Sequence, residues 1–150
     1  MVRPLVGRLD ALRERLAPAV HAAAVEALAL RLAARMETDV LGKRFNELGA
    51  IQLQAEVRLI SDALSAATDG SVRHCFARLT QVSFLLTASS VGEATALAAE
   101  AVAAADGADG DGAGGGTPVR ARQRLSAAEV CRVMQLRVEF AGHDFASMFE

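Results

Sequence analysis

The sequence predicts an all-α protein, an antiparallel bundle of helices, and two observations support this prediction. Apolar residues recur every three or four positions along nearly all of the 150 residues, whereas the strict alternation of a half-buried strand is missing. Alanine also makes up much of the hydrophobic share of 52%, and alanine favours helix more than any other residue. The chain therefore has enough apolar surface to fold, distributed at helical spacing.

Proline and glycine divide the first part of the chain into three helices. A first apolar stripe stops near Pro18, and a proline is tolerated in the first turn of the helix that follows. We expect this long second helix to end at 46–49, with Gly49 in a left-handed cap conformation, and a third helix to run from about 50 to 67. The three stripes are Leu5, Leu9, Leu12 and Leu16; Val25, Leu28, Leu32, Met36 and Val40; and Leu53, Val57, Ile60 and Leu64.

A fourth helix is expected after the turn signal Asp69-Gly70, with Ser71 as its N-cap. Phe84 and Leu85 fall opposite its main stripe, and a helix that is apolar nearly all round usually lies between others. We therefore place it at the centre of the bundle. A fifth, alanine-rich helix is expected over 91–105. The main stripe of the fourth helix is Val72, Cys75, Phe76, Leu79, Val82 and Leu86.

The composition changes after residue 105. Residues 106–117 are almost entirely Gly, Asp and Ala, which cannot bury enough surface to offset the entropy of ordering them. We expect a flexible linker here, continued by a basic segment that holds Arg120, Arg122 and Arg124. A solvated segment is the simple interpretation of these arginines, and contact with phosphate or anionic lipid is the alternative.

The last part of the chain begins with a capping box. Ser126 and Glu129 stand three positions apart before an apolar run, so a sixth helix should start here and continue through Val138 until Gly142 breaks it. The predicted organisation is a helical bundle over 1–105, a flexible Gly/Asp-rich linker and basic segment over 106–124, and a C-terminal helix that packs back on the bundle over 125–150.

The sequence predicts no enzyme active site, cofactor site or metal site. A net charge of −2 and the absence of Trp and Tyr argue against binding nucleic acid, and no stretch of about 20 residues is free of charge, which argues against a membrane span. Adjacent residues on a helix point about 100° apart, so His74 and Cys75 are not expected to chelate one ion together. No pair of carboxylates is marked out for acid–base catalysis.

Several short motifs resemble the C-terminal end of subunit 4 of the conserved oligomeric Golgi complex. In that family a Phe-Asn-x-Leu-Gly-Gly-x-Gln segment precedes a Phe-Ala-Arg-Leu-Ser-Gln helix, and a Leu-Thr-Pro-Ala-Glu-Val helix start follows near the C-terminus. Here Ala50 replaces the second glycine of the first motif, and Ala127 replaces the proline of the last. The matching residues are Phe45-Asn46-Glu47-Leu48-Gly49-Ala50-Ile51-Gln52, Phe76-Ala77-Arg78-Leu79-Thr80-Gln81 and Leu125-Ser126-Ala127-Ala128-Glu129-Val130.

The resemblance implies the C-terminal tip of a rod-like vesicle-tethering subunit in intra-Golgi retrograde transport, bound peripherally at the cytosolic side of the Golgi membrane. The implied partners are the other subunits of the complex, SNAREs and associated trafficking proteins. A generic cytosolic helical adaptor or regulator unrelated to the Golgi is the alternative. Because the family members are much longer, a strip that would meet preceding helices is expected to be exposed, around Leu5, Leu9, Val25 and Leu32.

Arg78 and Glu129 lie in the matching motifs and are the candidate structural or interaction residues. Arg78 falls at the edge of the fourth helix's apolar stripe, and Glu129 falls in the first turn of the sixth helix, where the helix dipole favours a carboxylate. One hypothesis is a bidentate ion pair that holds the last helix on the bundle. The alternative is that Glu129 only closes the capping box with Ser126 while Arg78 is solvated.

Overall fold

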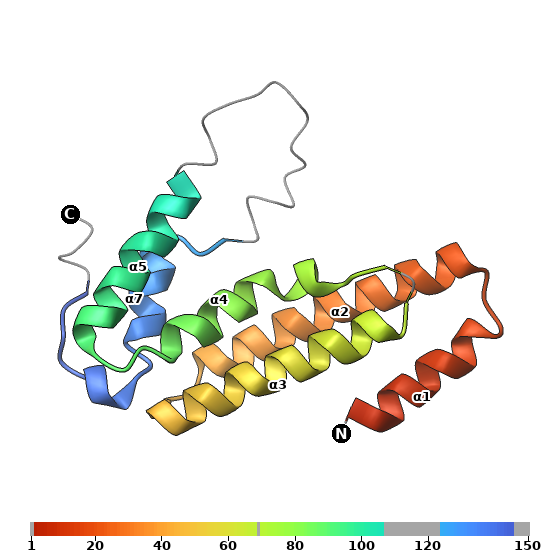
Figure 1. Cartoon of the computed structure of the whole chain (residues 1–150), viewed down its shortest axis with the longest axis horizontal. Coiled ribbons are helices and arrows are strands. Elements are labelled where there is room, and N and C mark those ends of the chain that lie inside the picture. Colours follow the sequence, from red (N-terminus) through yellow and green to blue (C-terminus); the bar gives the residue numbers. More distant parts are fainter. Residues whose placement is uncertain (1, 69, 107–123, 146–150) are drawn as a thin grey trace.

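The computed structural model describes residues 2–68, 70–106 and 124–145, and most of them are helical (Figure 1). No strand is present in these ranges, where an isolated parallel β-bridge joins Phe45 and Arg137. The predicted all-α bundle is therefore confirmed. In chain order the helices are α1 (Val2–Arg13), α2 (Pro18–Leu41), α3 (Glu47–Ala66), the 3₁₀ helix η1 (Arg73–Phe76), α4 (Ala77–Leu86), α5 (Val91–Asp106), α7 (Ala127–Met134) and the 3₁₀ helix η2 (Val138–Phe140).

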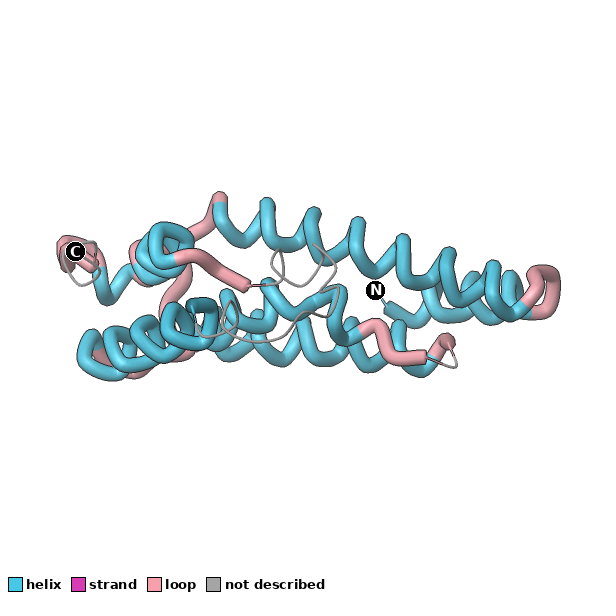
Figure 2. The backbone as a smooth tube through the Cα atoms, turned by 90° about the horizontal axis from the view of Figure 1, so that it is seen from above, coloured by secondary structure: helices cyan, strands magenta, loops and turns pink. Residues whose placement is uncertain are grey.

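The helices α2, α3 and α4 pack side by side in alternating directions and form the body of the molecule (Figure 1). Figure 2 shows an elongated shape, with the turn between α1 and α2 at one end and the C-terminal segment at the other. Since α4 contacts α2, α3, α5 and α7, its predicted central position is confirmed. Phe84 is the exception on this helix, because its side chain is exposed.

The core consists largely of the apolar faces that helical spacing predicts. On α3, the buried side chains of Leu53, Val57 and Leu64 lie on one face. On α2, Val25 and Val40 are buried, whereas Leu28, Leu32 and Met36 are half-buried against the core. Full burial of one such side chain contributes about 1.5–3 kcal/mol, so these faces provide much of the stability of the body.

The expected exposed strip on the first two helices is wrong for two of its residues. Leu9 and Val25 are buried because α1 folds back against α2 and α3. The buried His21 of α2 fixes this arrangement, since its Nε2 donates to the carbonyl oxygen of Leu9 at 3.0 Å. Leu32 is half-buried, and the side chain of Leu5 lies outside the described residues.

The expected C-terminal cap at Gly49 is also wrong. The C-cap of α2 is Gly42, seven residues earlier, and its φ of −91° is not left-handed. Asn46 instead caps the start of α3, where its Oδ1 accepts a hydrogen bond from the N–H of Gly49 at 2.8 Å. The segment between the two helices leaves the helical conformation because Phe45 takes part in the β-bridge.

The fourth and sixth helices are shorter than the periodicity predicts. Ser71 does not cap an α-helix, because η1 precedes α4 and takes Val72 as its N-cap. α7 ends at Met134 and does not continue through Val138. The reason is a pair of backbone hydrogen bonds of 2.9 Å in which Phe45 donates to Leu136 and accepts from Val138. Gly142 follows η2 with a φ of +94°, a conformation that glycine adopts without strain.

Most of the predicted linker lies outside the described residues. Asp106 is the last residue of α5, and the description resumes at Arg124. The flexibility of 107–117 and the surroundings of Arg120 and Arg122 therefore stay predictions, as does the division into three parts. The segment that begins at residue 124 packs on the bundle, because α7 contacts both α4 and α5.

Candidate functional site

Arg78 of α4 contacts three segments that are far apart in the sequence. Its Nη2 donates to Oε1 of Glu37 on α2 at 2.8 Å and to Oε1 of Glu129 on α7 at 2.6 Å. Its Nη1 donates to the backbone carbonyl oxygen of Arg124 at 2.8 Å. The structure thus brings together the two candidate residues and adds Glu37. We call Glu37, Arg78 and Glu129 the Arg78 cluster.

The Arg78 cluster is partly screened from solvent. The side chains of Arg78, Glu37 and Glu129 are 25%, 19% and 44% exposed, so their attraction is stronger than that of a fully exposed pair. Hydrogen bonding to Glu37, then to Glu129, raises the pKa of the Arg78 guanidinium despite partial burial. The hydrogen bond from Arg78 is the largest of the effects that lower the pKa of Glu129, to about 2. Glu129 is therefore ionised at neutral and mildly acidic pH.

Glu129 makes both contacts that the sequence analysis treated as alternatives. Its Oε2 accepts from the backbone N–H and the hydroxyl of Ser126, at 2.8 and 2.9 Å, and the reciprocal bond to Ser126 Oγ completes the capping box. Its Oε1 remains available for Arg78. The cap and the ion pair therefore coexist, each through one oxygen. How much the pair stabilises the C-terminal segment stays a prediction.

A second arginine, Arg137, lies in the C-terminal segment after α7 and binds it to the end of α4. Its side chain is only 1% exposed, and its Nη1 donates to the carbonyl oxygens of Leu86 and Ala88. These carbonyls lie at and just after the end of α4, where the last helical carbonyls lack intrahelical partners. Nε of Arg137 donates to Glu139 at 2.9 Å, and the guanidinium lies 4.9 Å from the centre of the Phe140 ring.

The turn between α2 and α3 also binds the C-terminal segment. Nη1 of Arg44 donates to the carbonyl oxygen of Gln135 at 2.7 Å, and the N–H of Glu47 donates to Oε1 of Glu139 at 3.1 Å. Together with the β-bridge at Phe45, these bonds fix residues 135–139 against the start of α3. They hold the motif at 45–52 against the residues that follow α7.

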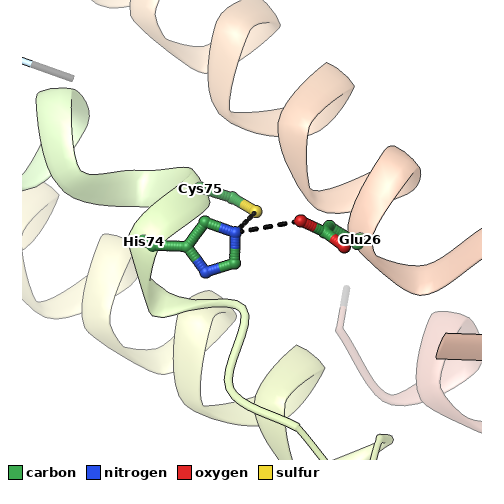
Figure 3. A group of neighbouring side chains, drawn as sticks. All are labelled: Glu26, His74 and Cys75. Atoms are coloured by element: carbon green, nitrogen blue, oxygen red, sulfur yellow. Dashed lines mark hydrogen bonds and ion pairs between the residues drawn. The ribbon is translucent and has the colours of Figure 1, made fainter. Parts of the chain in front are cut away.

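A third arrangement joins α2 and η1 at the surface (Figure 3). Nε2 of His74 lies 3.1 Å from Oε1 of Glu26 and 3.4 Å from Sγ of Cys75. The two side chains therefore meet, although neighbours on a helix were expected to point apart. The angle between neighbours concerns the Cα–Cβ bonds, whereas the imidazole turns about two further bonds and reaches back to the sulfur.

The outer surface carries several exposed apolar side chains. On α3, Leu48, Ile51 and Leu59 are 73%, 51% and 62% exposed and repeat at near-helical spacing on the face away from the core. Such a row suits contact with another protein, since exposed apolar area is removed from water on association. Among the described residues, no helix combines the length and the apolar character needed to cross a membrane.

Glu37 and Arg137 are the residues that the sequence analysis missed. Glu37 follows Met36 at the edge of the α2 stripe, as Arg78 lies at the edge of the α4 stripe, but most charged residues at such positions are solvated. Arg137 stands between Leu136 and Val138 in an apolar run, which was the available signal. Neither position indicates which distant partner it will meet.

The family model described as "Conserved oligomeric Golgi complex subunit 4, C-terminal" matches residues 6–116. The match includes the motifs around Phe45 and Arg78 and ends before the one that holds Glu129. Among curated proteins, conserved oligomeric Golgi complex subunit 4 of Arabidopsis thaliana is 33% identical over 114 residues, which are 76% of this chain and 13% of the relative. No solved structure gives a significant match.

The subunit 4 proteins of other organisms agree with this finding. The Drosophila melanogaster protein is 33% identical over 89 residues, which are 59% of this chain and 12% of the relative. The Homo sapiens protein is 30% identical over 129 residues, which are 86% of this chain and 14% of the relative. The chain thus spans only a small part of the length of these relatives. Because the family match covers most of the 150 residues, the chain belongs to the conserved oligomeric Golgi complex subunit 4 family, to whose C-terminal region it corresponds.

Proposed function

We propose that this chain acts as the C-terminal part of a Golgi vesicle-tethering subunit, through protein–protein contacts in intra-Golgi retrograde transport. The observation that carries the proposal is the match to the C-terminal region of a Golgi complex subunit over residues 6–116. The fold supports it, because a bundle of amphipathic helices with an exposed apolar row on α3 offers surfaces for other helical proteins.

The proposed partners are the other subunits of the conserved oligomeric Golgi complex, together with SNAREs and associated trafficking proteins. We place the chain at the cytosolic side of the Golgi membrane as a peripheral protein, held there by these contacts. Since the chain covers 12–14% of its relatives, contacts made by the rest of a relative belong to that relative and are not transferred here.

A function without catalysis fits the chemistry of the charged clusters. Both carboxylates of the Arg78 cluster are engaged by an arginine that remains protonated at any physiological pH. Burial, and then the charge of Glu26, raises the pKa of the Cys75 thiol, which keeps it protonated and a poor nucleophile in neutral solution. We therefore propose that the chain is not an enzyme.

Affinity purification of the tagged full chain from cells tests this function. We expect the other subunits of the Golgi complex to be enriched with the wild-type chain and lost with Leu64→Asp, which places a carboxylate in a fully buried position and unfolds the bundle. If the subunits were enriched equally with the wild-type chain and with Leu64→Asp, their capture would not depend on the folded bundle and would reflect binding to unfolded protein. Reproducible partners from outside the complex, without its subunits, would favour the generic helical adaptor and contradict the proposal.

A further inference from the structure

Glu26, His74 and Cys75 bring three different metal-binding atoms together between α2 and η1 (Figure 3). A carboxylate oxygen, an imidazole nitrogen and a sulfur lie within 4.8 Å of one another. Glu26 and His74 are about half exposed, and Cys75 is half-buried beneath them. None of the three takes part in the Arg78 cluster.

The second nitrogen of His74 sets the state of the ring. Nδ1 lies 3.2 Å from the carbonyl oxygen of Ser71, and because a carbonyl can only accept a hydrogen bond, Nδ1 carries a proton. In the neutral ring the lone pair is then on Nε2, which faces Glu26 Oε1 at 3.1 Å. A lone pair and a carboxylate oxygen at this distance repel unless a positive charge lies between them. Either a proton or a metal ion can provide it.

The hydrogen bond to Ser71 is also the outer contact that metal-binding histidines characteristically make. In protein metal sites the ring nitrogen that does not bind the metal donates to a carbonyl or carboxylate, which fixes the tautomer and the orientation of the ring. Here the acceptor, Ser71, lies just before the 3₁₀ helix η1 that carries both His74 and Cys75. The local backbone therefore fixes the imidazole and the thiol relative to each other.

We propose that Glu26, His74 and Cys75 form a zinc-binding site whose fourth position, on the solvent side, is taken by water. With zinc–nitrogen and zinc–oxygen bonds of about 2.0 Å and a zinc–sulfur bond of about 2.3 Å, tetrahedral ligand atoms lie about 3.3–3.6 Å apart. The nitrogen–sulfur distance of 3.4 Å matches this range, and the nitrogen–oxygen distance of 3.1 Å is close to it. The exposed Glu26 side chain can rotate to close the remaining edge.

The mixture of ligands selects the class of metal. A thiolate and an imidazole favour zinc over magnesium or calcium, which prefer oxygen ligands. Cys75 binds as the thiolate, so its proton passes to the solvent when the metal enters. Since Glu26 lies on α2 and the other two ligands lie on η1, bound zinc would join the turn before α4 to the long helix α2.

Zinc titration of the reduced, chelator-treated full chain, in competition with a chromophoric chelator, tests the site. We expect one zinc ion per chain and at least tenfold weaker binding in each of Glu26→Gln, His74→Ala and Cys75→Ser. Cobalt in place of zinc should give the absorption band of a cobalt–thiolate bond, and Cys75→Ser should abolish it. Circular dichroism checks that each variant is folded.

The chain offers matched controls of the same residue types. Cys131 and His143 lie outside the cluster, so Cys131→Ser and His143→Ala should leave the zinc affinity and the cobalt band unchanged. The proposal is overturned if the folded wild-type chain shows no saturable binding, which would leave a proton between His74 and Glu26. It is equally overturned if binding survives Cys75→Ser or is lost in either control.

Discussion

The body formed by α2, α3 and α4 and the C-terminal segment 124–145 are held in place in different ways. The body packs three apolar helix faces along their length, so its stability is divided among many side chains. The segment also buries apolar side chains, but its position depends on two arginines. Arg78 of the body binds Glu129 of the segment, and Arg137 of the segment binds the carbonyl oxygen of Ala88 just after α4. A region whose stability is divided among many side chains stays folded after a single substitution, whereas a region held by a few polar contacts is released when one of them is removed. A single change should therefore release the segment from a body that stays folded.

Of the changes considered, Arg137→Ala should weaken the attachment of the C-terminal segment most. It leaves the two carbonyl oxygens of Leu86 and Ala88 without their buried donor, and each buried acceptor left without a donor costs about 1–3 kcal/mol. Hydrogen exchange should accelerate across α7 while α3 stays protected. Arg132→Ala, which changes an exposed arginine of α7, should shift the free energy of unfolding by less than about 0.5 kcal/mol. Equal loss of protection in α3 and α7 would contradict the distinction between the two regions.

Arg78→Ala should have the second largest effect. We expect the free energy of unfolding to fall by about 2–4 kcal/mol, because the substitution leaves Glu37 and Glu129 without their shared donor. A double-mutant cycle with Glu129→Ala, followed by urea denaturation, measures the coupling between Arg78 and Glu129 directly. The exposed pair Arg35 and Asp39 on α2 provides the control, and its coupling should be about 0–1 kcal/mol. Strictly additive losses for Arg78 and Glu129 would rule out the ion pair as the anchor of the segment.

Acid should weaken the segment less than the loss of Arg78 does, because the hydrogen bond from Arg78 to the carbonyl oxygen of Arg124 does not depend on pH. The pKa of Glu129 is lowered from 4.5 to about 2 on folding, so its contribution is present above pH 4.5 and is lost as the pH falls from there toward 2. Stability measured from pH 7 to pH 3 should therefore fall more steeply for the wild-type chain than for Glu129→Gln. Because the pKa values of Glu93 and Glu139 are lowered as well, only the difference between the two chains reports on Glu129.

Ser126→Ala should have the smallest effect of the four. It removes the side chain that accepts from the N–H of Glu129 at the start of α7, and loss of such a cap costs about 1 kcal/mol. Ser126→Asp should restore most of the stability, because a carboxylate can cap the helix in the same way. If the alanine variant lost as much stability as Arg78→Ala, capping rather than the ion pair would be the main anchor of α7.

The sequence was sufficient for the body because its information there is local. The faces at Leu53, Val57 and Leu64 and the capping box at Ser126 were found from spacing alone, since a helix turns by the same angle at every residue. Errors appeared where a residue supported two local structures. Asn46 and Gly49 fit either the end of one helix or the start of the next, and the structure uses Asn46 to begin α3.

The candidate site was only partly predictable for the same reason. Arg78 and Glu129 were selected by their positions in recognisable motifs and at helix edges, but the shared partner Glu37 is separated from Arg78 by 41 positions. Arg137 was missed because it continues a helical pattern in the sequence, whereas the helix α7 ends at Met134. The β-bridge to Phe45 and the carbonyls at the end of α4 offer its backbone and side chain better partners than another helical turn would.

By itself, the sequence determined the helical class, the apolar faces of the body, the start of the last helix and the resemblance to a family of Golgi tethering subunits. Only the tertiary structure decided which helix ends are replaced by a β-bridge, that Glu37 and Glu129 share Arg78, and that Glu26 meets His74 and Cys75. The physical reason is the separation in sequence over which each interaction acts. Helix propensity and capping act within about four residues, whereas a buried guanidinium or a paired carboxylate takes whichever partner packing brings within about 3 Å.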